Sequence, residues 1–339
     1  MELFAYLSKM LWHPIALLLD PTYQTFWFTY VCTALFVVCV YFWKRRGKST
    51  HFRSLIQYLF PRKLFLHPST LLDLKLYIAG TFFIFLQASI LTSFSLIIND
   101  TLEAGLIYVS GTPEGFYKTV PVWYKIFFPV AFILLLELGY WFTHYIMHKV
   151  PFLWEYHKVH HSAVIMTPLT ELRQHPLELF LFPFFIALAT APLYAFTFWL
   201  FGESINLYYF WSFPFFLMVT FSTIGHLRHS HVNIGANRFW AHIIQTPAHH
   251  HIHHSADSKH FDTNLGFCLS VWDWAFGTLC IPKKGQRITF GIQDDLKHSN
   301  SFIDHWAQPV VQSFRVLTGG KEPFSSSRFL KEEKNTPEN

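Results

Sequence analysis

Histidine is the residue type in this sequence most able to do chemistry, because it is both abundant and clustered. The chain has 21 histidines, and 16 of them lie between His144 and His260. In a helix, positions i, i+3 and i+4 share one face with Cβ atoms about 5–6 Å apart, so imidazoles at these spacings can converge on a metal ion. Such clusters occur as HxxxH at 144–148, HxxHH at 157–161, HLRHSH at 226–231 and HHHIHH at 249–254.

The clusters offer more ligands than one ion can use. A tetrahedral structural zinc site takes about four ligands, whereas eight to ten imidazoles are present here, so the sequence predicts two metal ions. Imidazole ligands suit iron, zinc, copper or nickel. Carboxylates near such a site offset its charge and fix imidazole tautomers. The acids close to the clusters in sequence are Glu137, Glu171, Glu178, Asp257, Asp262 and Asp273.

The elements that must position these histidines are apolar enough to cross a bilayer. Of the 339 residues, 52% are hydrophobic and 14% are charged, against about a quarter charged in a soluble domain. A spanning helix takes about 20 apolar residues. Uncharged segments of that length run over 21–43, 76–99, 179–202 and 204–227, and a weaker one over 126–143 is interrupted by Glu137. We therefore expect an all-α integral membrane bundle.

Charge placement predicts the orientation of this bundle. Segment 44–75 holds eight Lys and Arg residues against a single acid, Asp73, and such loops stay on the cytoplasmic side. Counting spans from there brings every histidine cluster to the cytoplasmic face, where a helical cap would hold the two metals. The membrane would be the endoplasmic reticulum or a bacterial inner membrane. The net charge of +5 is mild and not arranged in a basic, aromatic stripe, so no nucleic-acid partner is predicted.

The chain divides into three expected segments. Residues 1–120 would contain an interfacial helix over 1–20, two membrane helices and the basic loop. Residues 121–285 would form the catalytic region, with a membrane hairpin at 179–227. Residues 286–339 would form a cytoplasmic segment that becomes disordered from about residue 325, where the composition turns polar.

Together these motifs resemble the fatty acid hydroxylase superfamily, which includes the sterol desaturases. The resemblance covers about residues 126–280. Besides the histidine clusters it rests on the R-x-H-P-x-E pattern that starts at Arg173, on DTNLG at 262–266 and on WDWAFGT at 272–278. The single histidine between the hairpin and the last cluster departs from the family's HSN-like pattern, so His226, His229 and His231 all stay open for that position, with His229 the best fit.

The resemblance implies a membrane diiron oxygenase that uses O2 and two electrons to hydroxylate or desaturate a lipid C–H bond. The implied metal ligands are His144, His148, His157, His160, His161, His229, His249, His250, His253 and His254. No catalytic residue beyond this metal site is implied. The residues expected to support the ligands are Glu137, Glu171, Arg173, His175, Glu178, Asp262 and Asp273.

The substrate expected from the resemblance is a sterol or sterol-like lipid, with fatty acyl chains, ceramides and alkylglycerols as alternatives. Two iron ions would be the cofactor, although zinc can replace them in purified protein because it binds nitrogen-rich sites more tightly than Fe(II). Electrons would come from a separate donor, either cytochrome b5-like or a ferredoxin with its reductase. The competing interpretations are a metal transporter and a zinc-braced membrane scaffold without catalytic activity.

Overall fold

The computed structural model describes residues 12–21, 23, 25–46, 51–111, 115–117, 119–202, 209–210, 213–292 and 299–319. Within these residues the fold is helical apart from one pairing of two-residue strands, as the sequence predicts. Of the helix expected over 1–20, residues 12–19 are described and are helical. The tail predicted to be disordered from about residue 325 lies outside the described residues.

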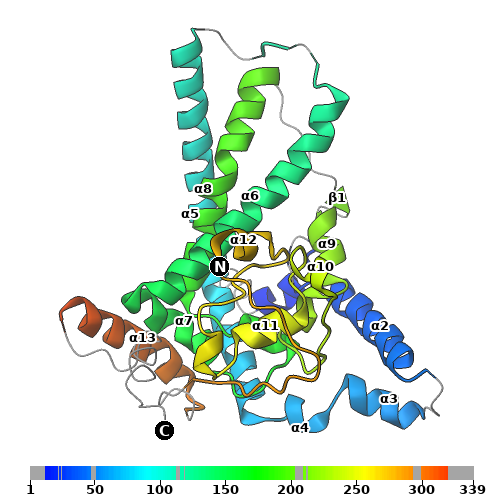
Figure 1. Ribbon diagram of the computed structural model, residues 1–339. Coiled ribbons are helices and arrows are strands. Elements are labelled where there is room, and N and C mark those ends of the chain that lie inside the picture. Colours follow the sequence, from blue (N-terminus) through cyan, green and yellow to red (C-terminus); the bar gives the residue numbers. More distant parts are fainter. Residues whose placement is uncertain are drawn as a thin grey trace, which may run out of the picture.

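Three long helices project from the molecule as a stem (Figure 1), namely α5 (Pro68–Ser110), α6 (Val122–Lys149) and α8 (Pro176–Phe201). Helix α8 packs against both of the others. Gly139 of α6 permits a close approach to α8, because a Cβ atom there would lie 2.8 Å from both the Ile186 Cα atom and the Phe185 carbonyl oxygen. Any larger residue at 139 would therefore push the two helices apart.

The shorter elements form a body at the base of the stem. Figure 1 shows α11 near its centre, α7 and α13 on one side, and α2, α3 and α4 on the other. The bounds are α2 (Trp27–Lys44), α3 (Phe52–Leu59), α4 (Arg62–Phe65), α7 (Pro151–His161), η1 (Pro168–Leu172), α9 (Phe215–Phe221), η2 (Gly225–Leu227), α10 (Arg238–Ala241), α11 (Pro247–His253), η3 (Ser258–His260), α12 (Val271–Phe276) and α13 (Phe302–Leu317), where η marks a 3₁₀ helix.

Three helices in the described part of the chain are long and apolar enough to cross a membrane. They are α2, α6 and α8, which contain most of the predicted spans at 21–43, 126–143 and 179–202. Large apolar side chains on their outer faces are exposed, including Leu35 at 61% and Trp123 at 65%. The three apolar helices show that the chain is a membrane protein.

The predicted span at 76–99 lies within α5, which is not one of these three helices.

In the described part of the predicted return limb, no helix is long enough to span a membrane. The sequence predicts one over 204–227, but the described part of this segment forms β1 (Tyr209–Phe210) paired with β2 (Phe213–Pro214), then the seven-residue α9 and η2. Proline disfavours a helical conformation in the preceding residue, here Phe213, and α9 begins at Phe215, directly after Pro214. For the described residues the prediction of one continuous helix is therefore wrong.

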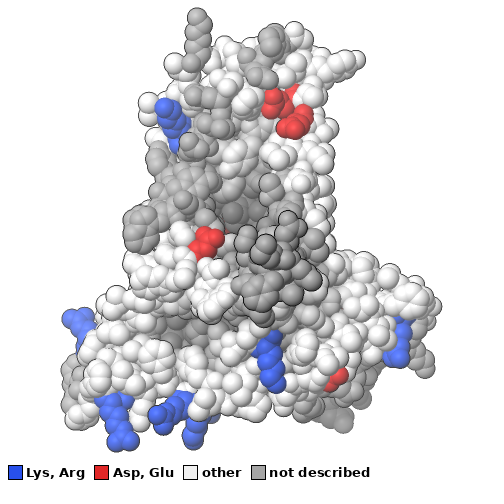
Figure 2. All heavy atoms as spheres, turned by 180° about the vertical axis from the view of Figure 1, so that it is seen from behind, with Lys and Arg blue, Asp and Glu red and all other residues white. Residues whose placement is uncertain are grey.

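Charged side chains are unevenly distributed along the molecule. On the face shown in Figure 2, most Lys and Arg side chains lie around the base of the body, at the end opposite the tip of the stem. The basic segment 44–75, which includes α3 and α4, contributes to this end. On this face, the base of the body is therefore more basic than the stem.

Candidate metal centre

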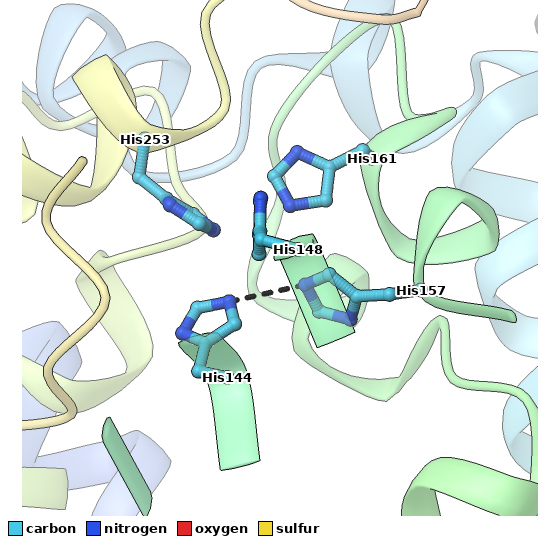
Figure 3. A group of neighbouring side chains, drawn as sticks. All are labelled: His144, His148, His157, His161 and His253. Carbon is cyan, nitrogen blue, oxygen red and sulfur yellow. Dashed lines mark hydrogen bonds between the residues drawn. The ribbon is translucent and has the colours of Figure 1, made fainter. Parts of the chain in front are cut away.

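The first group of histidines forms where α6 ends and α7 begins. His144 and His148 lie one turn apart at the end of α6, and His157 and His161 lie one turn apart on α7, which Pro151 starts immediately afterwards. His253 of α11 completes the group. The five side chains are buried, and one nitrogen of each lies within 4.8 Å of those of the others (Figure 3).

A second group lies beside the first. It consists of His160 of α7, His229 after η2, and His250 and His254 of the α11 segment, again with nitrogens within 4.8 Å of one another. The two groups share their supporting elements, because adjacent histidines in α7 and at the end of α11 point into different groups. The rings of His161 and His254, one from each group, stack with centroids 4.4 Å apart.

Oxygen acceptors behind the imidazoles determine which ring nitrogen carries the proton. An oxygen that only accepts requires the facing Nδ1 to donate, which leaves the Nε2 lone pair free. Six of the nine imidazoles have such acceptors: Leu265 O for His144 at 2.7 Å, Asp262 for His148 at 3.3 Å, Glu178 for His157 at 2.7 Å, Arg173 O for His160 at 3.2 Å, Glu171 for His229 at 2.6 Å and Thr263 O for His253 at 2.9 Å.

The remaining nitrogens fit a bound cation in each group. The Nε2 atoms of His144 and His157 lie 3.0 Å apart, as do those of His160 and His229. Since Nδ1 holds the proton in all four rings, each pair brings two lone pairs together with no hydrogen between them. Nitrogens bound to one divalent ion at about 2.1 Å would be separated by about 3 Å. The spacing therefore suits a metal ion between the rings.

Unpartnered nitrogens in the first group point to the same conclusion. The Nε2 atoms of His148, His161 and His253 are buried and have no hydrogen-bond partner among the described residues. Buried polar atoms without partners are rare in folded proteins, because they lose water without any compensation. A metal ion at the centre of the group would satisfy all three.

Burial keeps the imidazoles in the neutral form that metal binding requires. It lowers the pKa of the α7 histidines and of those at the end of α11 well below 6.5, namely His157, His160, His161, His250, His253 and His254. Burial alone would raise the pKa of Glu171, but His229, which donates to it, lowers that pKa below its usual value. Glu171 thus stays ionised and offsets part of the charge of a metal ion.

These pKa shifts predict how the metal-free protein responds to acid. The buried histidines resist protonation in the folded state, whereas unfolded histidines take up protons below about pH 6.5, so lowering the pH favours unfolding. We expect the chelator-treated protein in detergent to lose stability between about pH 7 and pH 5, by up to about 1.4 kcal/mol per pH unit for each such histidine. Urea unfolding at several pH values measures this, and a midpoint independent of pH would contradict it.

The structure distinguishes among the histidines left open by the sequence. His229 joins the second group, whereas His226 contacts Thr29 through Nε2 at 2.9 Å and His231 donates from Nε2 to the Tyr58 carbonyl at 2.7 Å. His249 lies outside both groups. Its Nδ1 accepts hydrogen bonds from the amide and hydroxyl of Thr246, at 3.2 and 2.7 Å, so this ring caps the start of α11.

Two of the expected supporting acids hold a backbone loop instead of a histidine. Glu137 is fully buried and accepts hydrogen bonds from the three consecutive amides of residues 267–269, at 2.8 to 3.2 Å. Asp273 accepts from the amides of Leu265 and Gly266 at 2.8 Å each. Because the Leu265 carbonyl accepts from His144, both acids act on the first group through the position of this loop.

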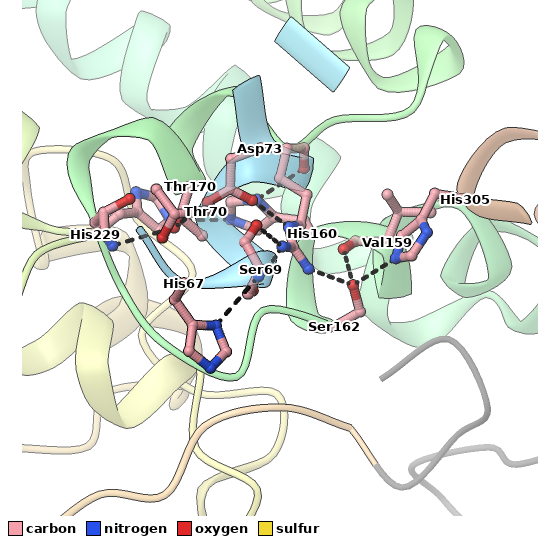
Figure 4. Close-up of polar contacts among 12 residues, drawn as sticks. His67, Ser69, Thr70, Asp73, Val159, His160, Ser162, Thr170, His229 and His305 are labelled. Atoms are coloured by element: carbon pink, nitrogen blue, oxygen red, sulfur yellow. Dashed lines mark hydrogen bonds and ion pairs between the residues drawn. The ribbon is translucent and has the colours of Figure 1, made fainter. Parts of the chain in front are cut away.

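Arg173 connects the second group to α5. Its carbonyl accepts from His160, while its buried guanidinium donates to Asp73 at 2.5 Å and also to Ser69 and Ser162. Figure 4 shows these four partners together. His175 begins α8, accepting from the Leu177 amide through Nδ1 and donating through Nε2 to the Trp306 carbonyl of α13. Neither side chain contacts a histidine of the two groups.

The sequence reasoning missed one charged residue beside the second group. Arg228 is 1% exposed, and its Nη2 lies 3.2 Å from Nδ1 of His250. The guanidinium carbon is 4.7 Å from the Phe267 ring centroid, and Nε and Nη1 have no hydrogen-bond partner among the described residues. The available signal was its position immediately before His229 in the sequence.

The fold and the two groups define a helical membrane protein with a candidate centre for two metal ions. Residues 129–278 match the family model described as fatty acid hydroxylase. Together with the relatives below, this match supports assigning residues 129–278 to the fatty acid hydroxylase superfamily.

Similar proteins include an ornithine lipid hydroxylase of Rhizobium tropici, which is 28% identical over 240 residues, or 70% of this chain and 65% of the relative. The alkylglycerol monooxygenase of Homo sapiens is 26% identical over 207 residues, or 58% of this chain and 36% of the relative. That of Xenopus tropicalis is 26% identical over 196 residues, or 51% of this chain and 37% of the relative. The chain thus covers less than two thirds of each relative. No solved structure matches.

Proposed function

We propose that this protein is a membrane-bound, O2-dependent oxidoreductase that hydroxylates a lipid at a site holding two iron ions. The observation that carries the proposal is the pair of adjacent buried histidine groups, in which lone pairs face each other at 3.0 Å. Two iron ions held there would activate O2, with two electrons from a separate donor, for attack on an unactivated C–H bond. Zinc in the same groups would give the alternative, a scaffold without this chemistry.

The protein's own residues would bind the two metal ions, orient the imidazole rings and exclude water from the centre. The first group would hold one ion and the second group the other. Carboxylates and carbonyls behind the rings keep Nε2 turned inward, and their loss in other metal sites costs about 10- to 100-fold in metal affinity or activity. The nine histidines are at most 7% exposed, so bulk water is excluded from the centre.

The names of the relatives favour hydroxylation of a lipid that carries hydrocarbon chains. One is named for ornithine lipid and the others for alkylglycerol, and none of them is named for a sterol or as a desaturase. Among the substrates considered from the sequence, we therefore propose an acyl or alkyl lipid ahead of a sterol. A sterol product or a desaturated product would be recognised in the experiment below.

The remaining features of the proposal concern the setting of the enzyme. We propose a multi-pass protein of the endoplasmic reticulum or a bacterial inner membrane, with the histidine groups on the cytoplasmic face. The basic base of the body supports this orientation, because Lys and Arg are retained on that side. The electron donor would be a separate cytoplasmic protein, cytochrome b5-like or a ferredoxin with its reductase.

Lipid mass spectrometry under 18O2 tests the activity. Cells that express the wild type with a reductase should contain a lipid carrying one 18O atom, and cells that express the double variant His160→Ala, His161→Ala should lack it. Each substitution removes a ring from a different group. A product two mass units lighter would instead indicate desaturation. If no lipid differs from the variant in several host membranes, the oxygenase proposal fails.

A further inference from the structure

An apolar pocket of about 410 Å³ is lined in part by η1 and by the residues on either side of His229 in the sequence. One wall comes from α2 and the α3–α4 segment, including Ala34, Val37 and Phe65. The other comes from η1 and the η2 segment, including Leu169 and Leu227. The size is in the range of small-molecule sites, which are about 300–1,000 Å³ and mostly apolar.

Most polar groups in the pocket wall bond to the protein, although Nδ1 of the lining residue His231 has no hydrogen-bond partner among the described residues. The hydroxyl of Thr33 donates to the Phe221 carbonyl at 2.7 Å, and that of Ser230 donates to the Leu227 carbonyl at 2.9 Å. The His226 ring stacks on Tyr30 at 3.9 Å and bonds to Thr29. A polar or charged molecule would lose its water here with little compensation, whereas a hydrocarbon would gain from burial.

The pocket opens where α2 presents an apolar surface. Val31 lines the pocket and is 46% exposed, and Phe60 lines it and is 57% exposed. On the same helix Leu35 is also exposed, and α2 is one of the three helices apolar enough to cross a membrane. The mouth is therefore continuous with a surface that bilayer lipid would cover, so a lipid chain can enter without crossing water.

The inner wall belongs to the elements that hold the second group. Leu169 lies in the same 3₁₀ helix as Glu171, which accepts from His229 at 2.6 Å, and Ser230 directly follows His229. A molecule in the pocket would thus rest on the back of the Glu171–His229 pair. Eight of the 15 lining residues precede residue 129, where the family match begins, so about half of the pocket wall comes from the N-terminal segment outside that match.

We propose that this pocket holds one hydrocarbon chain of the lipid substrate and so anchors the lipid beside the metal centre. That the bound lipid is the substrate rests on the proposed function. The inference also makes the N-terminal segment the part of the protein that selects lipids by the length of their hydrocarbon chains. The hydrocarbon chain in the pocket would serve as an anchor and would not itself react, because η1 and η2 separate it from the inward-facing Nε2 atoms.

Photo-crosslinking tests the pocket without any turnover. The full chain, purified in detergent and stripped of metal, is mixed with a phosphatidylcholine that carries a diazirine in one acyl chain, irradiated and digested. Peptides from α2 and from the η1 and η2 segments should be labelled. Ala34→Trp, which fills the pocket, should reduce this labelling about tenfold, because overpacking such a space excludes a bound chain.

Two further variants make the result specific. Leu35→Trp places the same bulk on the exposed side of the same helix and should leave pocket labelling unchanged. Leu169→Trp fills the pocket from the opposite wall and should repeat the effect of Ala34→Trp if that variant misfolds. Normal metal content after reloading shows that a variant is folded. Labelling that persists in both filled variants, or that is absent from the wild type, would overturn the proposal.

The two proposals can fail separately. If 18O is incorporated into a lipid but the pocket is not labelled, the pocket inference is wrong and the oxygenase proposal stands. If the pocket is labelled but no oxygenated lipid forms, the chain binds lipid without the proposed activity. If both hold, Ala34→Trp should shift the oxygenated products towards shorter chains, whereas Leu35→Trp should not.

Discussion

His229→Ala should reduce the metal bound by the reloaded protein from about two ions per chain to about one, and it should abolish lipid oxidation. His229 is central to the second group, with its Nε2 2.7 to 3.1 Å from the Nε2 atoms of His160, His250 and His254. Structural zinc sites bind with about 10–16 kcal/mol, so losing one ligand of four costs several kcal/mol. Elemental analysis by mass spectrometry of the purified variant measures the stoichiometry.

His251→Ala is the matched control for this experiment. His251 lies in the same histidine run and is 5% exposed, yet it belongs to neither group. It should retain both ions and most of the activity. His157→Ala should also lose about one ion, this time from the first group, and the combination with His229→Ala should lose both. If His229→Ala keeps two ions, the proposed second site is wrong.

Asp73→Leu should destabilise the protein by about 3–5 kcal/mol, because it leaves the Arg173 guanidinium buried without its counter-ion. Asp73 and Arg173 are 0% and 1% exposed, and Asp73 also accepts from the Thr170 hydroxyl at 2.9 Å. The loss should extend to the second group, since the Arg173 carbonyl orients His160. Denaturant unfolding in detergent, followed by tryptophan fluorescence, measures the change.

The double variant Asp73→Leu, Arg173→Leu separates charge from packing. Removing both partners of a buried pair is often less damaging than removing one, because no buried charge remains unpaired. We expect the double variant to recover part of the stability that Asp73→Leu loses. If the double variant is as unstable as the sum of both single variants, the pair contributes through its contacts with Ser69 and Ser162 and not through charge.

Local spacing was enough to predict that histidines converge, because a helix places residues i, i+3 and i+4 on one face. The same geometry explains why adjacent histidines separate: neighbours on a helix are about 100° apart. His160 and His161 therefore face different groups, as do His253 and His254. Which clusters meet was not predictable, because this depends on how α11 packs beside α7.

Nearness in sequence identified the supporting acids but did not distinguish their contacts. Glu171, Glu178 and Asp262 each contact a histidine of the two groups. Glu137 and Asp273 hold the loop over 265–269 instead. All five acids are near the clusters in sequence, and only the path of the loop determines which of them reach a ring.

Apolar composition predicted membrane helices where it runs unbroken, but it was misleading over 204–227, where Pro214 delays the start of a helix. Composition also gave no indication of the Asp73–Arg173 pair. These residues are 100 positions apart, so no local pattern connects them. The contact of Arg228 with His250 was not predictable either, because it depends on how the interior packs.

By itself the sequence determined the apolar helices, the number and local grouping of the imidazoles, and the resemblance to fatty acid hydroxylases. These depend on residue type and on helical spacing over a few residues. Only the tertiary structure decided that nine histidines form two adjacent groups, that His249 caps α11 instead of joining them, and that an apolar pocket lies behind Glu171 and His229. The reason is physical: each of these features requires side chains far apart in sequence to pack together.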